Sequence, residues 1–117
     1  MLLSSHHINI KTYKVPLFRL IDFGLAREMG GMDKVKCNMV GTMEFMSPEV
    51  MKCTFASPAS DMWSVGVLLF MMVSGGLSPF WCGSDTATQR KVVRADYSFD
   101  SEVFGPVSQH AKDLIAK

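Results

Sequence analysis

Few side chains in this sequence have the spacing of a known catalytic or metal-binding motif. The candidate metal ligands, cysteine and histidine, are the simplest to assess. Cys37, Cys53 and Cys82 are far apart and form no CxxC pair. Their spacing predicts neither a zinc ribbon nor a disulfide framework, and it favours a reducing compartment. The three histidines share no recognisable ligand spacing either. We therefore expect no metal site built from these two residue types.

Asp22 is the acidic residue best placed to act at a site, because it opens the triplet Asp22-Phe23-Gly24 directly after a short apolar run. No acidic residue precedes it in the chain. Taken alone, the triplet is a weak signal, since three residues recur by chance. An acidic side chain at the end of a strand is the plainer interpretation until other segments support a functional one.

The segment before the triplet and the one after it differ in pattern. Leu17 to Ile21 form an apolar run with one charge, which predicts a strand that begins or has an exposed edge at Pro16. Residues 24–46 contain four glycines and no sustained period, which predicts a long loop. Loops of this length in a compact domain are usually functional or disordered.

Four helices are expected after the loop. Serine is a good N-cap and proline fits a first turn, so Ser47-Pro48-Glu49 reads as a helix start. A second helix starting at Ser60-Asp61 and ending near Val73 is apolar on nearly all sides, which predicts burial all round. Three short helices cannot cover all sides of such a helix, so it needs further packing partners. The other expected segments are a helix from Ser84 or Asp85 to about Arg94, a loop over Asp96 to Gly105, and a helix after Ser108.

Length and composition limit the classes of protein. The chain has 117 residues, enough for one domain, with 48% hydrophobic and 20% charged residues and a net charge of +1. This balance gives no reason to expect nucleic acid or a membrane surface as the main partner. The apolar run Val65–Val73 is too short to span a membrane, and Met1–Leu3 is too short for a signal peptide. We expect a cytoplasmic protein.

Several segments, in order along the chain, resemble the C-terminal lobe of eukaryotic protein kinases. Within that family they are most similar to the calcium/calmodulin-dependent kinases of the myosin light chain kinase, titin and twitchin-like group. Any one motif is weak, but the ordered set is specific, and it covers residues 19–117. The segments are Asp22-Phe23-Gly24 (DFG), GTMEF at 41–45 (resembling GTPEF), SPE at 47–49 (resembling APE), DMWSVGV at 61–67, GLSPF at 76–80 and AKDLI at 111–115.

This resemblance implies a mainly α fold, an incomplete C-terminal lobe whose parent fold is α+β. It places a partial kinase domain at 19–117, and it leaves 1–18 as a segment without motifs, a candidate remnant of the catalytic-loop region. It implies a magnesium ligand at Asp22 and a protein-substrate docking loop at Gly41, Thr42, Glu44 and Phe45. Residues implied to act structurally are Phe23, Gly24, Ser47, Pro48, Glu49, Asp61, Trp63 and Gly66.

The resemblance also shows what is missing. If Asn9 were the asparagine that ends the catalytic loop, as a cofactor-binding residue, the catalytic aspartate would fall on Ser4. Serine cannot accept a proton as a carboxylate does, so no catalytic base is identified. The glycine-rich loop and the strand lysine are not expected in this chain. Glu49 would lack the arginine with which the family pairs it, and Asp61 would lack the loop that it holds.

By resemblance, the parent domain is a Ser/Thr kinase that uses ATP and magnesium on a protein substrate, while this chain alone is expected to be inactive and to bind neither. Residues 25–41 contain no Ser, Thr or Tyr, which excludes phosphorylation in that stretch. Regulation by calmodulin would need a tail that is not in this sequence. The alternatives are a non-catalytic, pseudokinase-like binding module and a truncated product without independent function.

Overall fold

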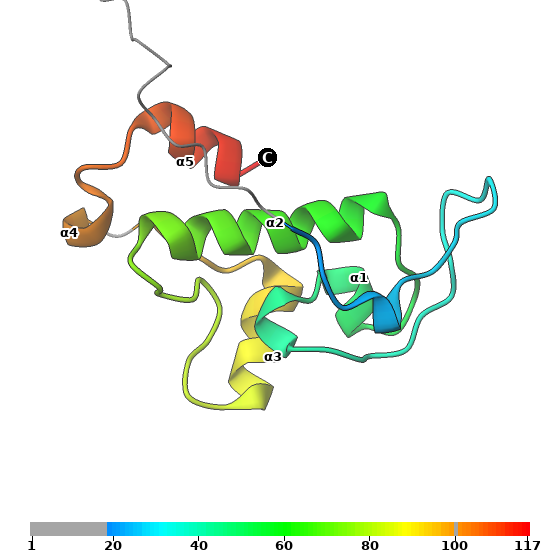
Figure 1. The fold of residues 1–117 in the computed structure, drawn as a ribbon. Coiled ribbons are helices and arrows are strands. Elements are labelled where there is room, and N and C mark those ends of the chain that lie inside the picture. The colour runs from blue at the N-terminus through cyan, green and yellow to red at the C-terminus, as the bar shows by residue number, and fades with distance from the viewer. Residues whose placement is uncertain (1–18, 100) are drawn as a thin grey trace, which may run out of the picture.

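The computed structural model describes residues 19–99 and 101–117, and this part of the chain is helical (Figure 1). It contains no strand, only an isolated antiparallel bridge between Val35 and Ala56. The partial, mainly α architecture expected from the sequence is confirmed. The elements are the 3-10 turns η2 (Phe23–Leu25) and η3 (Met43–Phe45) and the helices α1 (Pro48–Met51), α2 (Pro58–Val73), α3 (Asp85–Arg94), α4 (Ser101–Phe104) and α5 (Gln109–Ile115).

Helix α2 is the central element, with α5 on one side of it and η3, α1 and α3 on the other (Figure 1). It begins earlier than the sequence predicted: Ser57 precedes the first turn with an extended backbone, and Pro58 occupies its first position. Proline at that position loses no hydrogen bond, because the first N–H groups of a helix have no partner inside the helix. The predicted start at Ser60 is therefore wrong by one turn. The helix ends at Ser74, where Gly75 and Gly76 follow with positive φ angles.

The prediction that α2 is buried all round is wrong for the described part of the chain. One side packs inward through Ser60, Val67 and Phe70. The opposite side carries large hydrophobic residues that are 41–65% exposed, because α5 lies beside this side of the helix but leaves much of it uncovered. We call this exposed face the apolar stripe, and it consists of Met62, Val65, Leu68 and Met72.

The core lies between α2, α1 and α3. Its buried members are Met46, Met51, Val67, Phe80 and Val92. The indole ring of Trp63 stacks on Phe80 at a centroid distance of 5.4 Å. A second, aromatic cluster extends the core toward α4, and its members are Phe70, Tyr97, Phe99 and Phe104.

Two expectations about local structure are corrected. Part of the predicted strand, Leu17 and Phe18, lies outside the described residues, while residues 19–21 form no strand. An extended segment needs a hydrogen-bonded neighbour to become a strand, and no described segment pairs with it. The predicted loop from Asp96 to Gly105 contains the one-turn helix α4. Helix α3 and the start of α5 at Ser108 agree with the prediction, since both have a serine cap.

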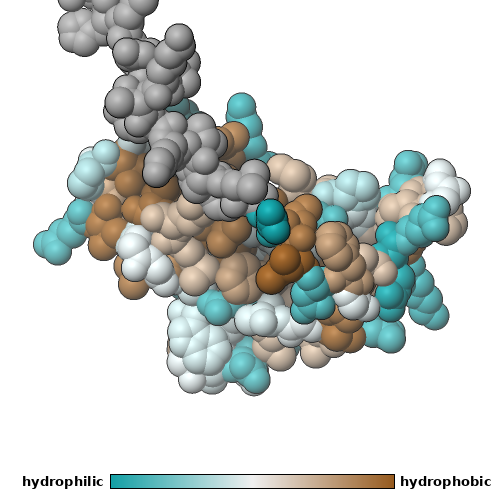
Figure 2. Space-filling model, viewed as in Figure 1, coloured by the Kyte–Doolittle hydropathy of each residue, from teal (hydrophilic) through white to brown (hydrophobic). Residues whose placement is uncertain are grey.

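No helix in the described ranges is long and apolar enough to cross a membrane. Hydrophobic surface nevertheless gathers over α5 and the neighbouring part of α2, as Figure 2 shows in brown. Leu114 of α5 is among the exposed hydrophobic residues, at 61%.

Candidate functional site

The DFG triplet forms an exposed turn. Asp22 has a left-handed backbone with φ of 62°, a conformation that aspartate tolerates better than most residues. Its carboxylate accepts a hydrogen bond from the Gly24 N–H at 3.4 Å, and the turn closes with the Ala26 N–H donating to the Phe23 carbonyl. Phe23 is 69% exposed, so the described chain covers little of this residue. The turn therefore presents the Asp22 carboxylate to solvent.

The segment after this turn is attached to the loop that leads into α2. The Val35 and Ala56 backbones exchange two hydrogen bonds, of 2.9 and 2.8 Å, at the isolated bridge. Beside this bridge the Lys34 ammonium lies 4.3 Å from the centre of the Phe55 ring, a cation–π contact. These contacts hold Lys34 and Val35 against the segment that leads into α2, although the two segments are distant in the sequence.

The predicted docking loop is anchored to α2 through its backbone. Ser64 donates a hydrogen bond to the Phe45 carbonyl at 2.8 Å, which fixes the end of η3 against the helix. Gly41, just before η3, has φ of 120°, which strains any residue with a Cβ atom. Thr42 is exposed, and its side chain makes no capping hydrogen bond to η3. The Thr42 hydroxyl is thus free to contact a bound molecule.

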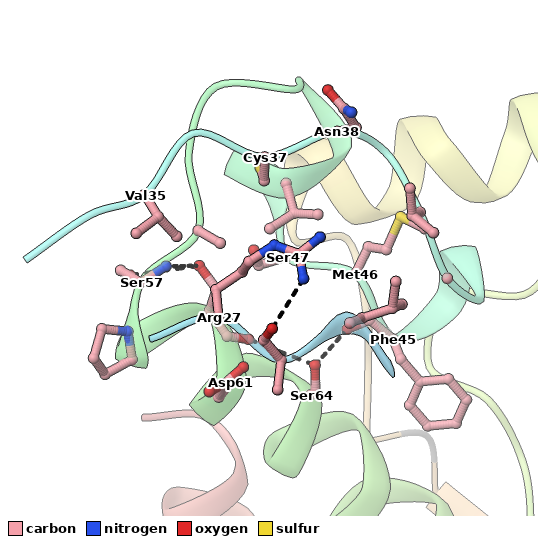
Figure 3. Close-up of a pocket in the computed structure, with 18 of the residues that line it drawn as sticks. Arg27, Val35, Cys37, Asn38, Phe45, Met46, Ser47, Ser57, Asp61 and Ser64 are labelled. Carbon is pink, nitrogen blue, oxygen red and sulfur yellow. Dashed lines mark hydrogen bonds between the residues drawn. The ribbon is translucent and has the colours of Figure 1, made fainter. Parts of the chain in front are cut away.

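A cavity of about 730 Å³ lies between these segments (Figure 3). Its wall combines residues that follow the DFG turn, the docking loop, and the first turns of α2. Predicted site residues that line it are Gly41, Thr42, Phe45, Ser47 and Asp61. Those that do not line it are Asp22, Phe23, Gly24, Glu44, Pro48, Glu49, Trp63 and Gly66.

Sequence reasoning assigned no role to five polar residues of the cavity wall: Arg27, Lys36, Asn38, Ser57 and Ser64. Two of them carried a signal: Ser57 precedes a proline, as a helix cap does, and Ser64 belongs to the segment DMWSVGV at 61–67. Arg27 donates to the Ala26 carbonyl at 2.9 Å, and neither Arg27 nor Lys36 forms an ion pair within the described ranges. The Ser47 hydroxyl, on a residue that is 1% exposed, has no hydrogen-bond partner among the described residues.

Glu49 is partnered differently from the expectation. Instead of an arginine, the Ser60 hydroxyl donates a hydrogen bond to its carboxylate at 2.5 Å. Burial acts to raise the pKa of Glu49. The hydrogen bonds that it accepts and the positive charge of Lys52 outweigh that effect, so the pKa lies below the ordinary value of 4.5. The carboxylate therefore stays charged near neutral pH without an arginine.

The other predicted residues of α2 are Asp61, Trp63 and Gly66. Asp61 is exposed, and no ion pair joins its carboxylate to the described residues. Trp63 and Gly66 line a second groove of about 580 Å³ between α2 and α5. Within the described ranges the Trp63 indole N–H is buried without an acceptor. Asn9 lies outside the described residues.

The described residues do not make a magnesium site by themselves. Protein-bound magnesium takes one or two carboxylates together with substrate phosphates and water. Asp22 offers one carboxylate, and the described part of the chain holds no cluster of three potential ligands. A complete site would need donors in addition to those in the described ranges.

Comparison with known sequences places the chain in a family. The family described as protein kinase domain matches residues 2–117. Myosin light chain kinase 3 from Danio rerio is 47% identical over 98 residues, which is 84% of this chain and 13% of that protein. Human myosin light chain kinase 2 of skeletal and cardiac muscle is 46% identical over 100 residues, which is 86% of this chain and 16% of that protein. The chain thus spans about a seventh of these relatives.

Solved structures agree with the sequence comparison. The twitchin kinase region of C. elegans superposes with a TM-score of 0.74 and 41% identity, covering 84% of this chain and 17% of that one. The autoinhibited serine kinase domain of titin gives a TM-score of 0.61 and 34% identity, covering 63% of this chain and 23% of that one. The family model, the sequence relatives and the solved structures all indicate the same family. The chain belongs to the protein kinase domain family, as part of the C-terminal lobe.

Proposed function

We propose that this chain is part of a Ser/Thr protein kinase whose complete domain transfers the γ-phosphate of ATP to a protein hydroxyl. The observation that supports it is the cavity that joins the docking loop to the start of α2, in a chain of this family. Specificity for Ser or Thr rests on GTMEF at 41–45 resembling GTPEF.

The proposed site residues take different roles in that complete domain. Asp22 would hold magnesium and, with it, the ATP phosphates, with Asn9 as a second cofactor-binding candidate. Gly41, Thr42, Glu44 and Phe45 would dock the protein substrate. Pro48, Glu49, Asp61, Trp63 and Gly66 would shape the lobe, together with Phe23, Gly24 and Ser47.

The 117-residue polypeptide alone is proposed to be inactive and to bind neither ATP nor magnesium. Phosphoryl transfer is positioning and charge stabilisation around a base that accepts the hydroxyl proton. Asp22 is the first acidic residue of the sequence, and Ser4 stands where alignment through Asn9 would place that base. A serine hydroxyl cannot take this role at neutral pH.

The proposal extends to organisation and partners. Residues 19–117 would be the partial kinase domain from the DFG triplet onward, and 1–18 a segment without motifs, a candidate remnant of the catalytic-loop region. The domain would act on proteins in the cytoplasm, not on nucleic acid or membranes, and calmodulin would control it only through a tail outside this sequence.

Two assays test the proposal. The first incubates the 117-residue chain with MgATP and a myosin light-chain peptide, and we expect no phosphate transfer above the blank. The second replaces the corresponding segment of human myosin light chain kinase 2 with residues 19–117. We expect this chimera to phosphorylate the peptide on serine or threonine.

Variants of the chimera distinguish the proposed magnesium ligand, Asp22, from the proposed docking residue, Thr42. We expect Asp22→Asn to lower kcat by at least about 100-fold, and Thr42→Ala to affect the reaction with the peptide more than the hydrolysis of ATP. Glu28→Gln, at an exposed position outside the cavity wall, is the matched control. It should leave both the phosphorylation of the peptide and the hydrolysis of ATP unchanged. Turnover by the 117-residue chain, or full activity of the Asp22→Asn chimera, would contradict the proposal.

The apolar stripe on α2 favours a second candidate, a non-catalytic binding module. In that case the folded chain would hold a protein partner at fixed stoichiometry. Replacing Leu68 and Met72 with lysine would abolish the complex without unfolding the chain. If the chain shows no cooperative thermal unfolding transition, this would instead favour a third candidate, a truncated product without independent function.

A further inference from the structure

Three Ser-Pro dipeptides occur in the sequence: Ser47-Pro48, Ser57-Pro58 and Ser78-Pro79. A serine followed by proline is the motif that proline-directed protein kinases phosphorylate. Such an enzyme must reach both the hydroxyl and the ring of the proline that follows it. The three dipeptides are chemically alike, so the fold decides which of them is accessible.

Two of the dipeptides are shielded. Ser47 is 1% exposed, and its hydroxyl faces the inside of the protein. Ser78 accepts hydrogen bonds from the backbone N–H groups of Phe80 and Trp81, at 3.4 and 3.1 Å. Pro79 is also buried, so a kinase cannot bind its ring.

Ser57-Pro58 differs in the exposure of its proline, although the Ser57 hydroxyl also accepts a backbone hydrogen bond, from the Ser60 N–H in the capping box of α2. Pro58 is exposed, and Ser57 is half-buried with an extended backbone (φ −149°, ψ 170°), the form in which kinases bind substrate chains. The Ser57 hydroxyl lies 3.4 Å from the Ser60 hydroxyl, a long contact that is cheap to break. Ser57 must be the donor in it, because the single proton of Ser60 is donated to Glu49.

The surroundings of Ser57 suit an added anion. Ser57 lines the 730 Å³ cavity together with Arg27 and Lys36, neither of which forms an ion pair with the described residues (Figure 3). The Ser47 hydroxyl, buried and without a described partner, lines the same cavity and can donate a hydrogen bond. One carboxylate, that of Asp61, opposes these groups on the wall, and Glu49 lies behind Ser60. The cations on the wall outnumber the carboxylate, and the cavity has room for a phosphoryl group.

We propose that Ser57 is a phosphorylation site for a proline-directed protein kinase, and that Arg27 and Lys36 receive the phosphoserine. The external kinase supplies MgATP. The bond between the β,γ-bridging oxygen and the γ-phosphorus breaks, the Ser57 oxygen bonds to that phosphorus, and ADP leaves. The Ser57 proton passes to the base of the external kinase. The modified side chain then links residues 25–42 to the start of α2 through charge-assisted hydrogen bonds.

The site is tested by treating the intact chain with a proline-directed kinase and MgATP and locating phosphate by mass spectrometry. We expect one phosphate, on Ser57, retained in Ser47→Ala and Ser78→Ala and lost in Ser57→Ala. Short peptides carrying each dipeptide are the control, and all three should be phosphorylated because the fold no longer shields them. Modification of Ser47 or Ser78 in the intact chain as fast as in the peptides would overturn the proposal. An unmodified Ser57 beside a modified peptide would do the same.

The receiving cations are tested by phosphorus NMR. A free phosphoserine loses its second proton with a pKa of about 6. We expect that pKa to fall by about one unit in the phosphorylated chain relative to the phosphopeptide, because nearby cations favour the dianion. Arg27→Gln with Lys36→Gln should remove the shift. Equal values in the chain and the phosphopeptide would refute the receiving role, and this comparison needs no variant to fold.

Discussion

The Ser60 hydroxyl donates a 2.5 Å hydrogen bond to the carboxylate of Glu49 and thereby connects α1 to the first turn of α2. The same oxygen accepts the backbone N–H of Ser57 at 3.1 Å. Ser60 is 6% exposed, so these bonds form largely out of water. One small side chain thus satisfies a partly buried carboxylate and an N–H group before a helix start.

Replacing Ser60 with alanine should destabilise the chain. The change leaves the Glu49 carboxylate and the Ser57 N–H without their partner, and such losses cost about 1–3 kcal/mol in the free energy of unfolding. Urea denaturation followed by circular dichroism measures it. Thr86→Ala, at an exposed position of α3, is the control and should change stability by less than about 0.5 kcal/mol. Equal effects of the two variants would show that the Glu49–Ser60 bond contributes nothing.

Stability should also depend on pH through Glu49. Its pKa in the folded chain is lower than the ordinary 4.5, so the unfolded chain takes up the proton first as the pH falls. The stabilisation from Glu49 is fully present above about pH 4.5 and is lost as the pH falls through the lower, folded-state pKa. Urea midpoints measured between neutral and acidic pH test this.

The matched variant for the pH series is Glu49→Gln, whose amide oxygen still accepts from Ser60 but does not titrate. We expect its urea midpoint to fall less steeply than that of the natural chain below pH 4.5. Parallel curves for the two proteins would mean that other groups carry the acid sensitivity.

Gly66 is a position at which a small substitution should stabilise the fold. A Cβ atom placed there would lie 3.5 Å from the Ile115 carbonyl oxygen of α5, an ordinary van der Waals contact. Because alanine favours a helix over glycine by about 0.8–1.0 kcal/mol, Gly66→Ala should raise the melting temperature. Gly66→Leu should lower it, because the larger side chain displaces α5. A lower melting temperature for Gly66→Ala would mean that α5 packs more tightly on α2 than this contact indicates.

The apolar stripe should tolerate charge. Replacing Leu68 and Met72, which are 50% and 57% exposed, with lysine should change the free energy of unfolding by less than about 1 kcal/mol. Sedimentation velocity should then show less association at high concentration, since the hydrophobic patch is interrupted.

Val67→Lys is the contrasting variant for the stripe, because Val67 is 3% exposed and a lysine there should unfold the chain. If the paired substitutions in the stripe unfold the chain as Val67→Lys does, then the stripe is buried in solution.

Local signals allowed most helices to be predicted. Ser84 and Ser108 accept backbone hydrogen bonds at the starts of α3 and α5, and Pro48 opens α1. The start of α2 was misplaced because Ser57 and Ser60 are both capable caps. Only the three-dimensional contact of Ser60 with Glu49 separates their roles. Helix α4 is a single turn, too short to produce a periodic pattern.

The cavity could be predicted only in part. Its docking-loop residues belong to recognisable motifs, whereas Arg27 and Lys36 carry no pattern of their own. They reach the cavity because the bridge between Val35 and Ala56 brings two distant segments together, and no local propensity encodes that pairing. The burial of α2 failed as a prediction for the same reason, since burial depends on neighbours and not on the helix itself.

The bridge at Val35 and Ala56 has a mechanical consequence. Two backbone hydrogen bonds fasten the middle of a mostly exposed stretch, while the DFG turn and the docking loop lie on either side of that fastening. The stretch is therefore divided into two arms with a shared pivot. The docking-loop arm is also held at η3 by the Ser64–Phe45 hydrogen bond, so opening the bridge would release the arm that carries the DFG turn more than the docking loop.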